Sequence, residues 1–249
     1  MKFLLVTGSL LLASVSPAMA GPVVRTEEGP VEGIGKGDVE AFLGVPYAAP
    51  PVGANRWRAP GPVTSWKAVR QANQFSPACY QAVAKPWGPY SEDFVASAPI
   101  SEDCLYLNLW KPAGAQKKLP VLVFIHGGGF GGGAGSLPVY DGAKLAARGA
   151  IVITINYRVG VFGFLAHPAL TAESGTKSSG NYGLLDQIAA LKWVRKNAAR
   201  FGGDAGNVTV SGESAGAASV NDLQVSPLAK GLFQKGISFS GATMAEIGR

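Results

Sequence analysis

Five residues near the end of this 249-residue chain, Gly212-Glu213-Ser214-Ala215-Gly216, constrain its fold more than any other feature. They follow a short apolar run, Val208 to Val210, and precede a stretch that suits a helix, Ala217 to Val220. A G-x-S-x-G sequence between a strand and a helix is typical of a sharp turn that lifts the serine above the edge of a sheet. The glycines leave room for that turn, and the N–H of Ala215 would point toward negative charge developing beside the serine.

The remaining pattern predicts an α/β fold in one domain. Two nearly continuous apolar runs, Leu119 to Ile125 and Ile151 to Ile155, predict strands buried on both faces. Two further segments are strand candidates: Leu105 to Trp110 and Lys235 to Ser240. Residues 22–43 contain short apolar runs broken by glycine, which predict small antiparallel strands. Helical spacing predicts a helix over residues 184–198 and a shorter one within 138–148. This alternation favours a mostly parallel sheet with helices on both faces.

Composition and the first 20 residues limit the class of protein. Hydrophobic residues make up 47% of the chain and charged residues 15%, which supports a sizeable core. The net charge is +6, but the basic residues are scattered, so we expect no nucleic-acid partner. Residues 1–20 resemble a signal peptide: Lys2 precedes a short apolar stretch, and Ala18-Met19-Ala20 is an A-x-A cleavage site. We therefore expect export to the periplasm or the medium after cleavage near Ala20, and no membrane span in the mature chain.

The two cysteines, Cys79 and Cys104, allow a single intramolecular disulfide. The alternative is a pair of unpaired buried thiols. An exported protein meets an oxidising compartment, and this favours the disulfide.

A glycine-rich segment follows the first apolar run, beginning His126-Gly127-Gly128-Gly129-Phe130. Open α/β sheets place ligand sites at the carboxyl ends of their strands, where this segment lies. Consecutive glycines let backbone N–H groups turn inward, so two of them and the Ala215 N–H could form a three-donor oxyanion hole. A phosphate cradle is the alternative, but the chain has no G-x-x-x-x-G-K-[ST] pattern at this segment and no acidic residue in the Rossmann position.

With these motifs the chain resembles the N-terminal half of the type-B carboxylesterase/lipase family, a group of α/β-hydrolases. Besides the serine motif and the glycine-rich segment, four stretches carry the resemblance: Phe42 to Gly53, Ser101 to Asn108, Asn156-Tyr157-Arg158 with Gly163-Phe164-Leu165, and Phe201 to Asp204. The match runs along nearly all of residues 21–249, which we therefore expect to be the N-terminal part of one carboxylesterase type-B domain.

The resemblance implies roles for particular residues. Ser214 would be the nucleophile, and Gly128, Gly129 and Ala215 would donate the oxyanion N–H groups. Glu213 would be a buried carboxylate that tunes electrostatics near the site, and Cys79–Cys104 would be the family's first disulfide. No metal and no organic cofactor are implied, and the partner would be a small-molecule ester. Trp87 lies in the loop between the cysteines, and we expect it to serve ordinary packing.

The sequence departs from the family pattern in the residues that follow Ser214. α/β-Hydrolases place the acid and the histidine of the triad after the serine. After Ser214 this sequence contains the acidic residues Asp222 and Glu246 but no histidine, and both of its histidines, His126 and His167, lie upstream. We therefore expect neither triad acid nor base in this chain. It would be the N-terminal portion of a longer exported serine esterase, its sheet truncated after the strand that follows the nucleophile helix.

The sequence is also compatible with a non-catalytic binding or adhesion-like module, or with an inert truncated product. The sequence leaves the ester substrate and the oligomeric state open.

Overall fold

The computed structural model describes residues 21–241 apart from 84, 87, 97, 98 and 115–117. The expected signal peptide at residues 1–20, together with Trp87 and Glu246, lies outside the described residues.

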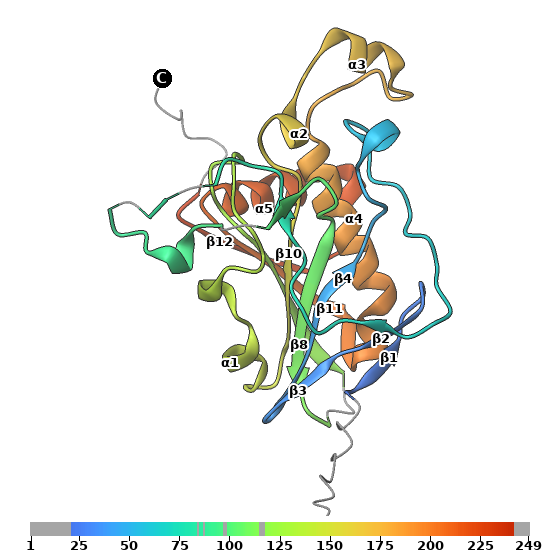
Figure 1. Cartoon of the computed structure of the whole chain (residues 1–249), viewed down its shortest axis with the longest axis vertical. Helices are drawn as coiled ribbons and strands as arrows, with labels where there is room; N and C mark the ends of the chain where they lie inside the picture. Colours follow the sequence, from blue (N-terminus) through green and yellow to red (C-terminus); the bar gives the residue numbers. More distant parts are fainter. Residues whose placement is uncertain (1–20, 84, 87, 97–98, 115–117, 242–249) are drawn as a thin grey trace, which may run out of the picture.

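The frame of the protein is a seven-stranded sheet (Figure 1). Its strand order from one edge to the other is β12 (Lys235–Phe239), β11 (Gly203–Glu213), β9 (Leu119–Ile125), β10 (Ile151–Ile155), β8 (Tyr106–Pro112), β4 (Val39–Pro46) and β3 (Ile34–Lys36). The first four strands pair in parallel, whereas β10–β8, β8–β4 and β4–β3 pair antiparallel. The sheet is thus parallel on the side that carries the serine motif and antiparallel on the other side.

Helices cover both faces of this sheet, as the alternating pattern predicted. Adjacent residues of β4 show the two faces: Phe42 packs in the large core cluster with Leu191 of α4 (Tyr182–Asn197), whereas Ala41 packs with Ala146 of α1 (Ala143–Ala146). Neighbouring side chains of a strand point to opposite faces, so the two clusters lie on opposite sides of the sheet. Strand β10 is buried along its whole length, as its nearly continuous apolar sequence indicated. Strand β9 was expected to be buried on both faces as well, but from Val121 onward its residues alternate between buried and half-buried.

Several short elements complete the fold. A small sheet contains β1 (Val23–Arg25), β2 (Pro30–Glu32) and β5 (Arg70–Gln71). The β1–β2 and β3–β4 pairs confirm the antiparallel strands expected in residues 22–43. Helices α2 (Gly160–Phe164) and α3 (Pro168–Glu173) form an excursion at the top of Figure 1 that the sequence did not indicate. Helix α5 (Ala215–Val225) begins directly after Ser214.

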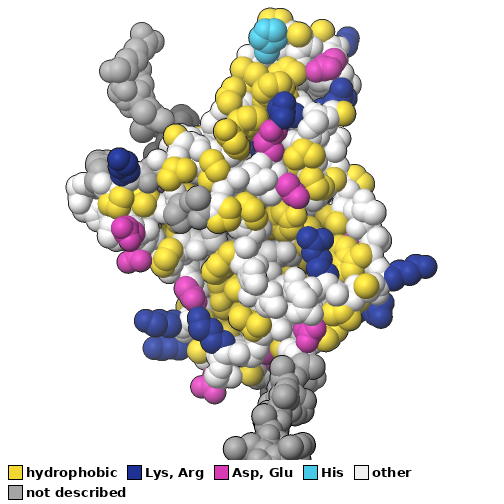
Figure 2. Space-filling view, viewed as in Figure 1, with side chains coloured by type: hydrophobic (Ala, Val, Ile, Leu, Met, Phe, Trp, Pro, Cys, Tyr) yellow, Lys and Arg dark blue, Asp and Glu magenta, His cyan; other side chains and the backbone are white. Residues whose placement is uncertain are grey.

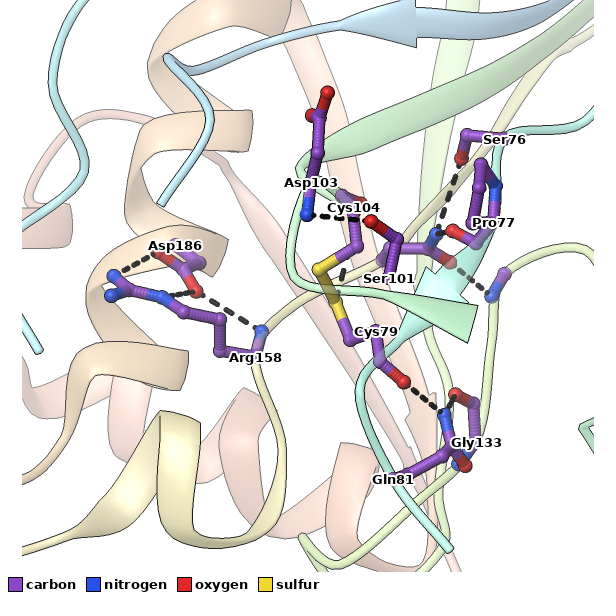
Figure 3. Close-up of a disulfide and its surroundings, with 12 residues drawn as sticks. Ser76, Pro77, Cys79, Gln81, Ser101, Asp103, Cys104, Gly133, Arg158 and Asp186 are labelled. Atoms are coloured by element: carbon purple, nitrogen blue, oxygen red, sulfur yellow. Dashed lines mark hydrogen bonds and ion pairs between the residues drawn. A yellow bond between two sulfur atoms is a disulfide. The ribbon is translucent and has the colours of Figure 1, made fainter. Parts of the chain in front are cut away.

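The Cys79–Cys104 disulfide is present, with Cα atoms 4.9 Å apart (Figure 3). Cys79 belongs to β6 (Ala78–Cys79), which pairs with β7 (Ile100–Ser101), and Cys104 shortly precedes β8. Both cysteines are buried. The expected bridge is confirmed, and it closes a loop whose two ends are also joined by a short parallel strand pair.

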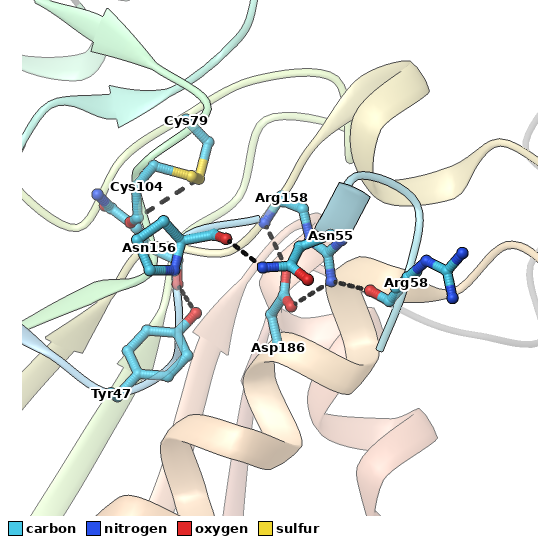
Figure 4. A network of polar contacts seen from close by, with 9 residues as sticks. Tyr47, Asn55, Arg58, Cys79, Cys104, Asn156, Arg158 and Asp186 are labelled. Atoms are coloured by element: carbon cyan, nitrogen blue, oxygen red, sulfur yellow. Dashed lines mark hydrogen bonds and ion pairs between the residues drawn. A yellow bond between two sulfur atoms is a disulfide. The ribbon is translucent and has the colours of Figure 1, made fainter. Parts of the chain in front are cut away.

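A buried ion pair that sequence reasoning missed joins the segment after β10 to α4 (Figure 4). The Arg158 guanidinium donates to both carboxylate oxygens of Asp186, from Nε at 2.8 Å and from Nη2 at 2.7 Å, and the Arg158 N–H donates to Oδ2 at 3.0 Å. The side chains are 3% and 0% exposed. Arg158 also donates to the carbonyl oxygen of Arg58 at 2.9 Å. These bonds fix the chain at the end of β10.

No helix in the described part of the chain combines the length and apolarity needed to cross a bilayer. On the face drawn in Figure 2, lysine and arginine side chains lie at several separate places, with a few side by side at the lower left and acidic side chains near some of them.

Candidate active site

Ser214 sits on the sharp turn that the glycine spacing predicted, between β11 and α5. Its backbone has φ 54° and ψ −121°, a strained combination for a residue with a side chain. Only glycine fits two residues before and two residues after Ser214. A Cβ on Gly212 would strike the backbone of Gly216, and a Cβ on Gly216 would strike the carbonyl oxygen of Ile125. The Ser214 N–H donates to the Phe239 carbonyl of β12 at 2.9 Å, which ties the turn to the next strand.

The glycine loop, defined here as residues 126–133, follows β9 and packs against this turn. A Cβ on Gly127 would lie 2.7 Å from the Glu213 carboxylate and 3.1 Å from Cβ of Ser214. Gly128 and Gly129 have φ of 106° and 59°, which residues with a side chain rarely adopt. The Gly128 carbonyl accepts N–H groups from Gly131 at 3.0 Å and Gly132 at 3.2 Å. The glycines therefore allow both the loop's conformation and its close approach to the serine.

A cavity of about 840 Å³ lies where the loop and the turn meet. Ser214, Gly128, Gly129 and Glu213 all line it. Most other side chains in its wall are apolar or aromatic, among them Tyr90, Phe94, Val95, Phe124, Leu137, Val139 and Phe239. Ala215 is buried at the first position of α5, next to Ser214. The structure thus gathers four of the residues expected from the sequence around one mostly apolar cavity and places the fifth, Ala215, next to Ser214 at the start of α5.

Glu213 ends β11 and stands in the cavity wall. It is half-buried, less enclosed than the resemblance implied, and burial raises the pKa of its carboxyl group. Tyr140 lies near enough to Glu213 to feel its charge. Burial raises the pKa of the Tyr140 hydroxyl, and the negative charge of the Glu213 carboxylate raises that pKa further. Sequence reasoning missed Tyr140, which reaches this cavity from a turn between β9 and α1.

His126 is a buried structural residue. Its ring stacks on that of Tyr157 with 4.3 Å between centroids, and Nδ1 lies 2.8 Å from the Gly127 carbonyl oxygen. Because a carbonyl only accepts, Nδ1 carries the proton. The Tyr157 hydroxyl donates to the His126 carbonyl at 3.0 Å. His126 is not among the residues that line the cavity.

His167 and Asp222 likewise do not line the cavity. His167 is exposed and caps α3, where its Nδ1 accepts the Ala169 N–H at 3.2 Å. Asp222 lies on α5, and burial raises the pKa of its carboxyl group. Neither residue is placed to act on Ser214 through the cavity.

His126 should make the protein less stable as the pH falls from about 6.5 to about 4. Burial lowers the pKa of its imidazole to about 4, whereas in the unfolded chain it takes up a proton near 6.5. Between these pH values the unfolded state binds one more proton than the folded state, so protonation of His126 lowers the free energy of unfolding by about 3 kcal/mol at pH 4. An NMR titration of the imidazoles measures the pKa of His126, and His167→Gln identifies the signal of the exposed ring. A midpoint near 6.5 for the buried ring would contradict this assignment.

Comparisons with known proteins assign the chain to a family. The profile of the Carboxylesterase family matches residues 20–248, so the chain belongs to the carboxylesterase family. It is 50% identical over 216 residues to fumonisin B1 esterase of Sphingopyxis macrogoltabida, and 50% identical over 226 residues to para-nitrobenzyl esterase of Bacillus subtilis (strain 168). These alignments cover 86% and 90% of this chain but 39% and 45% of the relatives.

Solved structures agree with the sequence comparison. A structure of PNB esterase superposes with a TM-score of 0.80 at 48% identity, covering 88% of this chain and 44% of that one. The fold is therefore that of an α/β-hydrolase, and the chain spans less than half the length of the relatives it matches. Acetylcholinesterase of Bungarus fasciatus is 45% identical over 240 residues, which cover 93% of this chain and 39% of the relative.

Proposed function

We propose that this protein is an exported serine carboxylic-ester hydrolase in which Ser214 is the nucleophile. The observation that carries the proposal is the position of Ser214: it stands on a strained strand-to-helix turn and opens into the same cavity as Gly128 and Gly129. A serine on such a turn is exposed to a substrate carbonyl rather than buried in the sheet. Membership of the carboxylesterase family supports ester hydrolysis as the reaction.

The proposed reaction is acyl transfer in two steps. Ser214 Oγ attacks the ester carbonyl while a base takes its proton, and the carbonyl oxygen of the tetrahedral intermediate accepts N–H groups of Gly128, Gly129 and Ala215. The C–O bond to the alcohol then breaks, and the base returns the proton to the leaving oxygen. Water attacks the acyl-serine in the same way and releases the acid and the free serine. Each step conserves protons and needs no oxidant or reductant.

The base and its acidic partner are proposed to come from sequence outside these 249 residues. Hydrolases of this fold supply them after the serine, and residues 215–249 contain no histidine. The relatives are more than twice as long as the part this chain matches, which gives room for both groups. A protein consisting of residues 21–249 alone should therefore show little turnover. Rapid Ser214-dependent turnover by that protein would contradict this part of the proposal.

The proposed substrate class is a small carboxylic ester with an apolar acyl or alcohol part, because most of the cavity wall is apolar. Relatives at 45–50% identity are named for three different esters, so the proposal goes no further than this class. The intact serine turn and glycine loop favour the enzyme over a non-catalytic binding module or an inert product.

Chemical labelling tests the proposed nucleophile. In the protein as isolated from its host, an alkyl fluorophosphonate should attach once, at Ser214, as located by peptide mass mapping, and should stop ester hydrolysis in proportion to the labelling. Labelling at another serine, or full labelling of Ser214 without loss of turnover, would sink the proposal.

Export is proposed from the sequence of residues 1–20 and agrees with the disulfide between Cys79 and Cys104. N-terminal sequencing of the protein recovered from its host should begin at Gly21, in the periplasmic or culture fraction. A mature protein that begins at Met1 and stays in the cytoplasm would contradict export.

A further inference from the structure

Gln81 joins the disulfide segment to the glycine loop (Figure 3). Its side chain pairs with both backbone groups of Gly133: Nε2 donates to the carbonyl oxygen at 2.8 Å, and the Gly133 N–H donates to Oε1 at 2.7 Å. Nε2 also donates to the carbonyl oxygen of Cys79 at 2.9 Å. The amide group is thus held on one side by the disulfide-bonded strand and holds the end of the loop on the other.

The loop needs such a tether because its glycines have no side chains to pack. Gly133 has φ of 112°, and a Cβ there would strike the His126 ring. A Cβ on Gly132 would lie 2.7 Å from Oε1 of Gln81. The loop can therefore be positioned at this point only through backbone hydrogen bonds and close contact with Gln81. Further along the chain, the Gly135 N–H donates to Oδ1 of Asn156 at 2.8 Å.

The tether acts on the part of the loop that faces the cavity. The N–H groups of Gly131 and Gly132, immediately before Gly133, both bind the carbonyl oxygen of Gly128. That carbonyl shares a planar peptide with the N–H of Gly129, which points the opposite way. Fixing Gly133 therefore restrains Gly132, then the Gly128 carbonyl, and with it the direction of the Gly129 N–H.

We propose that Gln81 is a positioning residue for the oxyanion hole, and that the Cys79–Cys104 disulfide holds Gln81 in place through the Cys79 carbonyl. This rests on the proposed function, since it assigns the Gly129 N–H to the oxyanion. Gln81 also lines the cavity, but its Nε2 donates to Cys79 and Gly133 and its Oε1 accepts from Gly133, so we assign its effect to the loop and not to a bond with the substrate. Its effect belongs to the transition state, where the oxyanion forms, and not to the binding of the ester.

Kinetics of Gln81→Leu in the esterase as isolated from its host test the inference. Leucine keeps a similar volume without hydrogen bonds. We expect kcat for a short-chain aryl ester to fall about 10- to 100-fold, because the Gly129 N–H no longer points at the oxyanion. KM should change less than about twofold. Gln71→Leu is the matched control, because the side chain of Gln71 has its described hydrogen bonds with Glu32 and Asn73 and lies outside the cavity wall. An unchanged kcat, or a rise in KM alone, would overturn the inference.

Gln81→Glu separates positioning from packing and serves if the leucine variant folds poorly. Glutamate keeps the acceptor for the Gly133 N–H but, when ionised, turns an oxygen toward the carbonyls of Cys79 and Gly133. Once protonated it donates to one of them again. The ratio of its kcat to that of the wild type should therefore rise as the pH is lowered. A ratio independent of pH would contradict the tether.

Hydrogen exchange reports on the tether without any turnover. The Gly133 amide should exchange about tenfold faster in Gln81→Leu, the effect of losing one hydrogen bond, and unchanged exchange would overturn the inference.

The proposed function and the proposed role of Gln81 can fail separately. If Ser214→Ala leaves turnover intact, the proposed function fails while exchange still decides whether Gln81 holds the loop. If Ser214 is essential and Gln81→Leu retains full kcat, only the role of Gln81 fails.

Discussion

Replacing Ser214 with alanine is expected to lower kcat for a short-chain aryl ester by about 10⁶-fold in the protein as isolated from its host. The change removes the oxygen that would form the acyl-enzyme, and single losses of a catalytic serine in hydrolases have effects of this size. The glycine loop remains, so a residual rate of about 10³–10⁴ over water can persist. Steady-state kinetics on the purified variant measure the effect, with traces of wild-type enzyme excluded by prior fluorophosphonate treatment.

Ser211→Ala is the matched control for this prediction. Ser211 is 3% exposed, lies on β11 three residues before Ser214, and is not among the residues that line the cavity. The same chemical change at this position should leave kcat within a few-fold of the wild type. If both variants lose activity equally, the loss reflects the strand and not the nucleophile. If Ser214→Ala keeps turnover within tenfold of the wild type, Ser214 is not the nucleophile.

Replacing Asp186 with alanine is expected to lower the free energy of unfolding by about 3–5 kcal/mol. The carboxylate accepts three hydrogen bonds from Arg158, and both side chains are almost fully buried. Removing it leaves a guanidinium inside the protein without its counter-charge, which costs far more than an exposed pair would. Denaturant unfolding gives the difference through the transition midpoint.

Glu173→Ala provides the comparison for a surface pair. Glu173 meets Arg58 at 3.5 Å with side chains 53% and 57% exposed, so its loss should change the free energy of unfolding by less than about 1 kcal/mol. Equal and small effects of the two substitutions would mean that Arg158 finds water or another partner. The buried pair would then not fix the end of β10.

The elements that sequence predicted well are those set by local pattern. Strands β9 and β10 have the bounds of their apolar runs, and α4 matches the helical spacing within two residues. The turn at Ser214 follows from two glycines that no other residue can replace, because Gly212 and Gly216 meet neighbouring backbone. The strands, the helix and the glycine spacing of the turn are patterns of residues close together in the chain, which a sequence displays directly.

The features that sequence missed depend on residues far apart in the chain. The antiparallel half of the sheet requires β8 to pair with both β4 and β10, and nothing in their own residues specifies that partnership. The Arg158–Asp186 pair joins residues 28 positions apart, and the bonds from Gln81 to Gly133 span 52. The cysteine count did predict a long-range contact, because two cysteines leave a single pairing.

For the site, the sequence predicted which residues would meet but not their surroundings. Ser214, Gly128, Gly129 and Glu213 share the cavity because the carboxyl ends of neighbouring parallel strands β9 and β11 lie at one edge of the sheet. The aromatic wall contributed by Tyr90, Phe94 and Tyr140 was not foreseen. These side chains come from irregular segments whose path has no periodic signal.

Trapping the acyl-enzyme tests the central claim most directly. The protein is mixed with an aryl acetate, quenched in acid within the first turnover, digested and examined by mass spectrometry. The account predicts an acetyl group on the peptide that contains Ser214, and none in Ser214→Ala. Steady hydrolysis with no acylated peptide, or an acetyl group on another residue, would contradict it.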